Sequence, residues 1–373
     1  MIRFSEIINY IFVIGIAQGL FLSTILWRKK ENVFANKFLA LTILVFSFDL
    51  FTEVIALKGF INEIPWLYGL SNSIPYLYGP LVYLYVVFLI HKRESFQLTD
   101  LWHFLPFLIF QIYGIFFFYF EGSEYQLSLI NQTITAPWHV QLIGLMILPH
   151  GLSYLFATIF VIKKFNKTVK DNFSNIEDVD LSWLLYLIVG IMIIWAVVFL
   201  SYLLAYFYGK ELHADLLIYI TISVFLYTFA FKSYKKSEVT KIVTQTDENT
   251  SYKKSGLTEE VASRHIQNLH LLMKKEKSYL NDNFNLSLLA QKLNISNHNL
   301  SEIINTKLNQ NFYDFVNSYR VEEVKSLIKN DRESTYSILA HGFEAGFTSK
   351  SAFYSAFKKN TGLTPAQYRK TIL

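Results

Sequence analysis

The sequence contains no cysteine at all. This absence excludes disulfides, cysteine-ligated zinc fingers, iron–sulfur clusters and thiol catalysis. Charged residues are also scarce, at 17% of the chain, against about 25% in typical soluble proteins. The deficit lies in the first 231 residues, which indicates that this part of the chain is adapted to lipid, where each charge is costly.

The motifs of common enzyme classes are missing as well. The chain has no HExxH zinc motif, no phosphate-binding P-loop and no GxSxG nucleophile elbow. Its nine histidines are scattered, and no two of them stand at the i,i+4 spacing of a helical metal site. We therefore expect no enzyme, no metal ion and no cofactor.

Long apolar runs, in contrast, are abundant. A helix needs about 20 mostly apolar residues to cross the hydrocarbon core of a bilayer. Residues 1–231 contain seven stretches of roughly this length, which predict a seven-helix transmembrane bundle. The stretches are Ile7–Trp27, Phe38–Leu57, Ser71–Ile90, Leu101–Phe120, Trp138–Ile162, Leu184–Tyr208 and Asp215–Phe231. The first is too long for a cleavable signal peptide, so we expect it to be retained.

Lysine and arginine are unevenly distributed among the segments that flank these stretches. Thirteen of them follow the first, third, fifth and seventh stretches, whereas the other segments contain only Arg3, Lys58 and Lys210. Cytoplasmic loops are enriched in lysine and arginine. We therefore expect a multi-pass protein of the inner (cytoplasmic) membrane, with its N-terminus outside and its C-terminal region in the cytoplasm.

Three ionisable residues lie inside the predicted spans. Asp49 and Glu53 are one helical turn apart in the second span, and His150 follows Pro149 in the fifth. Ionisable groups within a membrane are candidates for function by default, which makes Asp49, Glu53 and His150 candidate sensor residues. The alternative is packing, in which a neutral carboxyl pairs with a neighbouring histidine or hydroxyl. The sequence leaves both interpretations open.

The character of the chain changes after residue 231. Residues 232–256 are polar and begin with several lysines, as expected of a linker close to anionic headgroups. Residues 257–373 then show seven amphipathic helical patterns and no strand pattern. Ser287, Ser296, Thr335 and Ser349 are predicted to precede or cap four of these helices. The expected fold is therefore all-α throughout, with a membrane bundle followed by a seven-helix cytoplasmic domain.

Two pairs of these helices have helix-turn-helix spacing. The first pair brings the apolar face of residues 289–293 against that of residues 295–304, and the second turns at Gly346. A connecting helix over residues 312–329 would be about 27 Å long at 1.5 Å per residue. That length suits two reading helices in successive major grooves, which recur about every 34 Å along DNA.

The last part of the chain resembles a known family. Residues 349–370, SKSAFYSAFKKNTGLTPAQYRK, resemble the C-terminal signature of the AraC/XylS family of transcription regulators. Residues 299–328 are similar to the first reading helix and connecting helix of that family. The N-terminal half resembles only an architecture, that of bacterial AraC-type regulators preceded by several membrane spans.

This resemblance implies a double-stranded DNA partner and a set of contact residues. The expected base contacts are Asn297, His298, Ser301, Glu302, Lys350, Ser351, Tyr354 and Ser355. The expected phosphate contacts, which set register without reading sequence, are Lys307, Lys358, Lys359 and Arg369. Asparagine suits adenine and lysine suits guanine, so the chemistry of these side chains supports parts of the assignment.

The sequence departs from the family pattern at His341 and Gly342, where an apolar residue and alanine are usual. A histidine at this core position is expected either to be partly exposed or to loosen the packing. Residues 257–373 also carry a net charge of only +4, from fifteen Lys and Arg and eleven Asp and Glu. Because one modestly charged domain binds DNA weakly, we predict a homodimer, which gains affinity by effective concentration.

The sequence as a whole predicts a membrane-embedded one-component transcription regulator. The spans would sense a signal, and the C-terminal domain would bind DNA. RNA polymerase and a signal ligand or membrane partner are further candidate partners. The alternative is a membrane receptor or transporter whose helical tail is a protein-interaction module without DNA binding.

Overall fold

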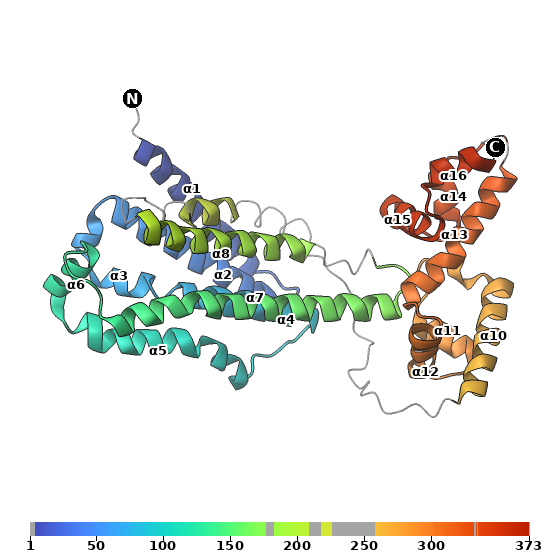
Figure 1. Cartoon of the computed structure of the whole chain (residues 1–373), viewed down its shortest axis with the longest axis horizontal. Helices are drawn as coiled ribbons and strands as arrows, with labels where there is room; N and C mark the ends of the chain where they lie inside the picture. Colours follow the sequence, from blue (N-terminus) through green and yellow to red (C-terminus); the bar gives the residue numbers. More distant parts are fainter. Residues whose placement is uncertain are drawn as a thin grey trace. The chain divides into compact units, whose positions relative to one another are not determined.

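The computed structural model describes residues 4–176, 183–208, 218–225, 258–331, 333 and 335–372, which fall in two units (Figure 1). The first unit contains Met1–Lys163 and Ser182–Glu238, and the second contains Lys164–Leu181 and Val239–Leu373. The described residues are helical apart from loops and one isolated antiparallel bridge between Phe173 and Asn285. The expected all-α fold is confirmed for these residues.

The first unit is built from long apolar helices joined by short helical turns. Its helices are α1 (Phe4–Trp27), α2 (Val33–Leu57), α3 (Trp66–Ser71), α4 (Pro75–Ile90), α5 (Leu105–Gly114), α6 (Gly122–Ile130), α7 (Trp138–Asn172) and α8 (Trp183–Tyr208). A 3₁₀ turn over Leu98–Phe104 and a π turn over Ile115–Tyr119 extend α5 at both ends. Helix α7 contributes its last nine residues, from Lys164 onward, to the second unit.

Four helical stretches of the described chain are long and apolar enough to cross a membrane. They are Glu6–Trp27, Val33–Leu57, Leu98–Tyr119 and Trp138–Asn172. The predicted third span is interrupted between α3 and α4, where Pro75 begins the second helix and cannot donate a backbone hydrogen bond. The predicted seventh span lies mostly outside the described residues, and the count of seven spans stays a prediction.

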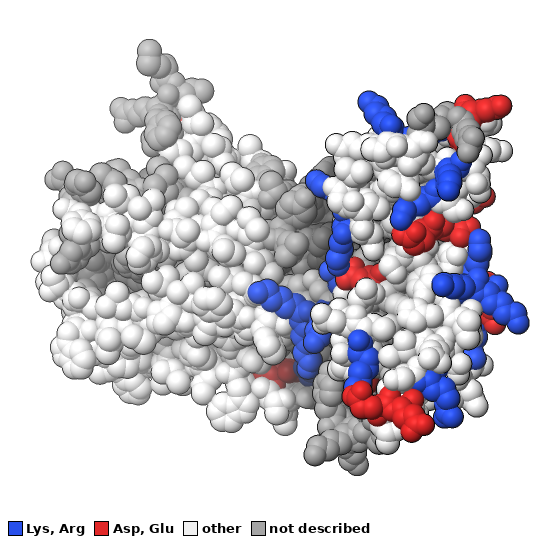
Figure 2. Space-filling view, turned by 45° about the vertical axis from the view of Figure 1, so that its right-hand side comes forward, with Lys and Arg blue, Asp and Glu red and all other residues white. Residues whose placement is uncertain are grey.

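The surface of these helices is apolar where the surface of a soluble protein would be polar. Phe21 on α1, Phe116 beside α5 and Phe156 on α7 are each more than 60% exposed. Apolar patches of this extent are uncommon on soluble monomers and are typical of a surface that meets lipid or a partner. Figure 2 shows few charged side chains among the atoms of this unit that are visible in that view.

The second unit contains seven helices among its residues from 258 onward. They are α10 (Glu259–Glu276), α11 (Leu286–Leu293), α12 (Asn297–Glu302), α13 (Phe312–Asn330), α14 (Ile338–Glu344), α15 (Lys350–Thr361) and α16 (Pro365–Ile372). Ser296 and Ser349 accept backbone hydrogen bonds as N-caps, as predicted. The cap of α11 was predicted wrongly, because Asn285 rather than Ser287 caps it. Thr335 precedes α14 as predicted, and Ser337 is its cap.

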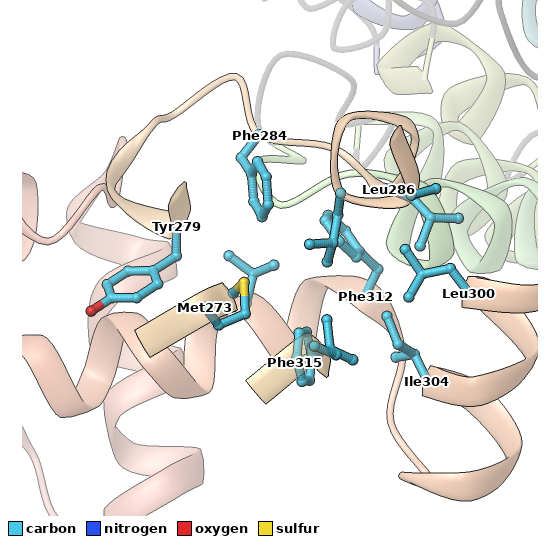
Figure 3. Close-up of a cluster of buried hydrophobic side chains, with 12 residues drawn as sticks. Met273, Tyr279, Phe284, Leu286, Leu300, Ile304, Phe312 and Phe315 are labelled. Carbon is cyan, nitrogen blue, oxygen red and sulfur yellow. The ribbon is translucent and has the colours of Figure 1, made fainter. Parts of the chain in front are cut away.

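Helix α13 supports two separate hydrophobic cores. Its N-terminal half, with Phe312, Phe315 and Val316, belongs to a core shared with α10, α11 and α12 (Figure 3). Its C-terminal half, with Val324 and Ile328, belongs to a core shared with α14, α15 and α16. We call α11 with α12 the first reading unit and α14 with α15 the second reading unit. One continuous helix therefore carries both.

Candidate nucleic-acid interface

The first reading unit turns tightly between its two helices. Asn294 ends α11 in the left-handed region with φ 53°, a conformation that asparagine tolerates better than most residues. Ser296 then caps α12 by accepting from the backbone N–H of Asn299 at 3.1 Å. Leu300 and Ile304 are buried in the first core, so the opposite face of α12 is turned away from that core. A π turn over Ile303–Lys307 continues the helix.

The four predicted base-contact residues of this unit share one face of α12. They stand at relative positions one, two, five and six, which are neighbours on a helix surface. Asn297 is exposed and donates from its amide to Ser287 Oγ at 2.8 Å. His298, Ser301 and Glu302 are half-buried, and His298 Nε2 lies 3.9 Å from Glu302 Oε2. The set is thus brought together, and its contacts with bases stay a prediction.

The second reading unit repeats this arrangement. Helix α14 ends at a turn where Gly346 has φ 92°, and a Cβ there would lie only 2.6 Å from the backbone oxygen of Tyr279. Glycine is therefore required both for the conformation and for the close approach. Ser349 caps α15 by accepting from the backbone N–H of Ala352 at 3.1 Å, and Phe353 and Phe357 anchor the helix in the second core.

The predicted base contacts of α15 have the same relative spacing as those of α12. Lys350, Ser351 and Ser355 are exposed, and Tyr354 is half-buried. The ammonium of Lys350 lies 5.6 Å from the centre of the Tyr354 ring, within the range of a cation–π contact. Both reading helices therefore present a four-residue face of the same pattern, although nothing in the structure tests which bases they meet.

The predicted phosphate contacts are in different situations. Lys358 is exposed, whereas Lys307 is paired with Glu259 and Lys359 Nζ lies 2.7 Å from Asp314 Oδ2. These pairs are solvent-accessible and contribute little to stability, so a phosphate can replace the carboxylate. In Figure 2 lysine and arginine side chains of the second unit lie beside aspartate and glutamate side chains.

Arg369 occupies a more enclosed position than a phosphate contact requires. Its side chain is 14% exposed, and its Nη2 lies 3.4 Å from Asp331 Oδ2. The same carboxylate accepts from the backbone N–H groups of Thr335 and Tyr336 at 2.8 and 3.1 Å. Asp331 therefore ties the end of α13 to the start of α14 and to α16, and the phosphate role of Arg369 stays a prediction.

The expectation that His341 is partly exposed is wrong, and the alternative, that it loosens the packing, stays a prediction. The side chain is buried at 2% exposure, and its Nε2 lies 3.0 Å from Asp331 Oδ2. Gly342 is equally well accommodated, because a Cβ at this position would lie 2.7 Å from the Phe353 ring. The histidine thus gains a polar partner at Nε2, while its buried Nδ1 has no hydrogen-bond partner among the described residues. The glycine makes room for a ring.

Burial alone would raise the pKa of Asp331, but its hydrogen bonds outweigh this effect. The backbone N–H groups of Tyr336 and Thr335, together with His341, lower the pKa of the carboxyl below its ordinary value. The carboxylate therefore stays ionised at neutral pH. We call Asp331, His341 and Arg369 the Asp331 hub.

Sequence reasoning did not single out Arg320, which is the largest fully buried side chain of the described residues. It lies four residues after Val316 and four before Val324, both of which are completely buried. A cation in the middle of an apolar helical stripe is a pattern from which the burial of Arg320 could have been predicted. The acceptors of Arg320 could not have been predicted from the sequence, because one of them lies 146 residues away.

The candidate sensor residues lie in the first unit, where only some are brought together. Asp49 on α2 is 5% exposed, and its carboxylate accepts a hydrogen bond from the Tyr78 hydroxyl on α4. Glu53 is half-buried one turn further along α2. His150 on α7 packs its ring 5.0 Å from the ring of Tyr76, and neither of its buried nitrogens has a hydrogen-bond partner among the described residues.

A small cavity lies between α2, α4, α7 and α8. Its volume is about 20 Å³, enough for one or two water molecules. Phe46, Tyr78, Gly151 and Trp195 are among its lining residues. The partner of Asp49 and the residue after His150 thus face the same space.

The relation to known proteins follows the geometry of the second unit. Residues 289–371 match the family described as "Helix-turn-helix domain". They form an AraC-type helix-turn-helix domain. The matched region begins within α11, contains α12, α13, α14 and α15, and ends one residue before the end of α16. A domain of this class binds DNA and is not an enzyme, so the C-terminal part of the chain is a DNA-binding, transcription-regulator domain.

Two individual proteins are similar to parts of the chain. An "Uncharacterized HTH-type transcriptional regulator in cgkA 5'region" of Pseudoalteromonas carrageenovora is 23% identical over 125 residues, which are 34% of this chain and 72% of that protein. A solved protein of unknown function from Listeria innocua is 26% identical, with a TM-score of 0.25, and the match covers 29% of this chain and 97% of that one.

Proposed function

We propose that the chain is a membrane-embedded one-component transcription regulator. One observation carries the proposal: an AraC-type domain, with two like reading faces on a single helix, shares a chain with four apolar helices of membrane length. In this proposal the AraC-type domain is cytoplasmic and binds specific DNA in successive major grooves. The N-terminal helices sense a signal.

The base-reading roles are assigned to the shared faces of α12 and α15. Their exposed ends, Asn297 and Lys350, are the best placed to meet base edges, with adenine and guanine as the preferred partners. Lys350→Ala is expected to reduce discrimination at one base pair by about 1–3 kcal/mol. Lys358→Ala should weaken binding to all sequences alike, because a phosphate contact carries no sequence information. Equal behaviour of the two variants across a panel of sequences would refute these roles.

Chromatin mapping of the intact protein in its own cell tests the proposal directly. A DNA-binding regulator should occupy a small number of specific sites, and binding of the full chain in nanodiscs to those fragments should weaken steeply as salt rises. A reporter fused at Leu373 tests the topology, and activity on the outer side of the membrane would overturn it.

A second candidate is a membrane receptor or transporter whose AraC-type tail binds another protein. It is favoured by the modest charge of the tail and by the ion pairs that occupy Lys307, Lys359 and Arg369. Absence of binding to any genomic fragment at low salt would favour this candidate over DNA recognition.

The sensing role is proposed for Asp49, with Glu53 and His150 as further candidates. It is supported by the buried contact of Asp49 with Tyr78 and by the cavity beside it. Asp49→Asn should alter the response of a target-gene reporter while the amount of protein in the membrane is unchanged. An unaltered response would leave the Asp49–Tyr78 pair with a packing role only.

We further propose that two copies of the chain act together on adjacent DNA sites. The net charge of +4 on residues 257–373 gives one domain little non-specific affinity, and pairing compensates through effective concentration. A single copy per operator in footprinting and mass measurements of the full chain would contradict this. RNA polymerase and a signal ligand or membrane protein are the other partners that a regulator of this type would need.

A further inference from the structure

Arg320 is a buried cation without an ion-pair partner among the described residues. It projects from the middle of α13 and is 2% exposed. Burial lowers its pKa to about 10, so the guanidinium is still charged at neutral pH. A buried charge without a counter-ion is tolerated only when hydrogen bonds replace the water it has lost.

Each of the five N–H groups of this guanidinium has an acceptor. Three acceptors come from the C-terminal domain itself: Tyr279 O at 2.7 Å, Asn281 O at 3.1 Å and Asn317 Oδ1 at 3.3 Å. The other two come from one residue far upstream, Ser174, whose backbone oxygen lies 3.0 Å from Nη1 and whose Oγ lies 3.3 Å from Nη2. Residues 258–372 alone therefore satisfy three of the five donors.

Ser174 is itself held by the chain that enters the first reading unit. Its backbone N–H donates to Phe284 O at 3.2 Å, and its hydroxyl donates to the same oxygen. The preceding residue, Phe173, forms an antiparallel bridge with Asn285, the N-cap of α11. Ser174 is 1% exposed, so it is a core residue of the second unit and not a surface contact. It follows α7 after a single intervening residue.

Arg320 also lies where the two reading units meet. Its guanidinium carbon is 5.8 Å from the ring of Phe347, which belongs to the core of the second reading unit. The backbone of Tyr279, which accepts from Arg320, approaches Gly346 so closely that a Cβ there would clash. One acceptor of Arg320, the backbone oxygen of Tyr279, thus lies against the turn of the second reading unit as well.

We propose that residues 173–176 are a docking segment that inserts beside Arg320 and sets the relative placement of the two reading units, with Ser174 as the positioning residue. The segment is the direct continuation of α7, so a displacement of α7 reaches the DNA-binding domain without passing through residues 232–256. This signalling consequence rests on the proposed function. The docking does not, because it depends only on contacts within the second unit.

The first experiment tests the contact in the full chain. The sequence has no cysteine, so a Phe173→Cys, Asn285→Cys double variant has no competing thiol. Residues opposite each other in an antiparallel bridge have Cα atoms about 4.5–5.5 Å apart, within the disulfide range of about 4.4–6.8 Å. Mild oxidation of the protein in nanodiscs should close an intrachain disulfide. The matched control is Lys164→Cys with Asn285→Cys, which shares the lost cap but places the thiol about two turns earlier on α7.

The second experiment tests positioning. Ser174→Ala removes one acceptor of the Arg320 guanidinium and also the hydrogen bond from the serine hydroxyl to Phe284 O, which together are expected to reduce the docked population about tenfold. It should slow disulfide closure in the double-cysteine background and change the affinity of the full chain for its mapped operator. Asn172→Ala is the control, because the Asn172 amide donates to Thr168 O within α7 and to no acceptor in the C-terminal domain among the described residues.

The outcomes separate the docking from the proposed function. Disulfide closure in the Phe173→Cys, Asn285→Cys variant but not in its control, together with an effect of Ser174→Ala on operator affinity, supports the inference. Failure to close while operator binding persists overturns the docking and leaves the proposed function standing. Closure without binding to any DNA fragment refutes the proposed function and keeps the docking. Closure with operator affinity unchanged by Ser174→Ala overturns the positioning role.

Discussion

The two reading units present the same face but are held in place by different chemistry. Each has a serine cap followed by four candidate contact residues in the same relative positions. Beneath the first lies an apolar core, and the segment after α7 is hydrogen-bonded to Phe284 of that core and to Arg320 beside it. The second depends on a smaller core and on the polar Asp331 hub.

This difference shows that a small DNA-binding domain can present the same contact face on two helices while different interactions hold each helix in place. The first reading unit meets the segment that follows α7 at Ser174, so it is sensitive to where α7 ends. The second contains buried ionisable groups, so it is sensitive to the charge of Asp331. Each reading unit can therefore be disturbed by a change that leaves the contact face of the other reading unit intact.

The largest effects are expected from truncating one core at a time. Phe315→Ala and Phe353→Ala each remove a completely enclosed ring, which should cost about 3–5 kcal/mol of stability. Hydrogen exchange of the full chain should show lost protection in α10–α12 for the first variant and in α14–α16 for the second. Equal loss in both regions for both variants would mean that the two cores unfold as one.

A smaller effect is expected from Gly342→Ala. The added methyl group would overlap the Phe353 ring at 2.7 Å, and overpacking of a filled core costs about 1–3 kcal/mol. Protection should fall in α14 and α15 and remain unchanged in α11 and α12. Glu344→Ala, an exposed change on the same helix, serves as the control, and a similar loss for both variants would contradict the proposed overlap.

Acid should affect the stability of the two reading units differently. The pKa of Asp331 is lowered in the folded state, so the stability it provides is complete above its unfolded pKa of about 3.9. That stability is lost as pH falls through the lower, folded value. Exchange measured between pH 5 and pH 3 should show α14 opening with a pH dependence that Asp331→Asn removes. The same pH dependence in the variant would assign it to another group.

The smallest effect is expected from releasing one lysine in each unit. Glu259→Gln frees Lys307, and Asp314→Asn frees Lys359. Because exposed ion pairs are weak competitors, each variant should raise operator affinity only about two- to threefold. Its salt dependence should also steepen, by at most one counterion. A loss of affinity would show that the carboxylates hold the lysines in position for DNA rather than compete with phosphate for them.

The sequence predicted the reading faces because their determinants are local. Serine caps at residues 296 and 349 and the i,i+4 spacing of helical neighbours define both the start of each helix and the face opposite its core. The one misassigned cap, at α11, is also local, but asparagine and serine cap about equally well. At α11 the apolar face begins at Leu286, one residue before the serine that we favoured.

The supports beneath those faces could not be predicted because they are not local. Lys307 meets Glu259 across 48 residues, and His341 meets the carboxylate of a loop residue rather than an apolar core. In the N-terminal unit, length and hydropathy indicated the helices α1, α2 and α7 correctly. They did not show that the third stretch divides at Pro75, because total hydropathy is indifferent to where a backbone donor is missing.

The order of synthesis gives the Ser174–Arg320 contact one more meaning. The serine leaves the ribosome 146 residues before the arginine, and the intervening chain includes α8 and all of α10–α12. Domains of nascent chains fold largely as units in the order in which they appear. The C-terminal domain therefore completes its folding around residues 173–176, which are synthesised before it. A chain in which residues 173–176 cannot reach the C-terminal domain would complete that domain with two N–H groups of Arg320 lacking acceptors.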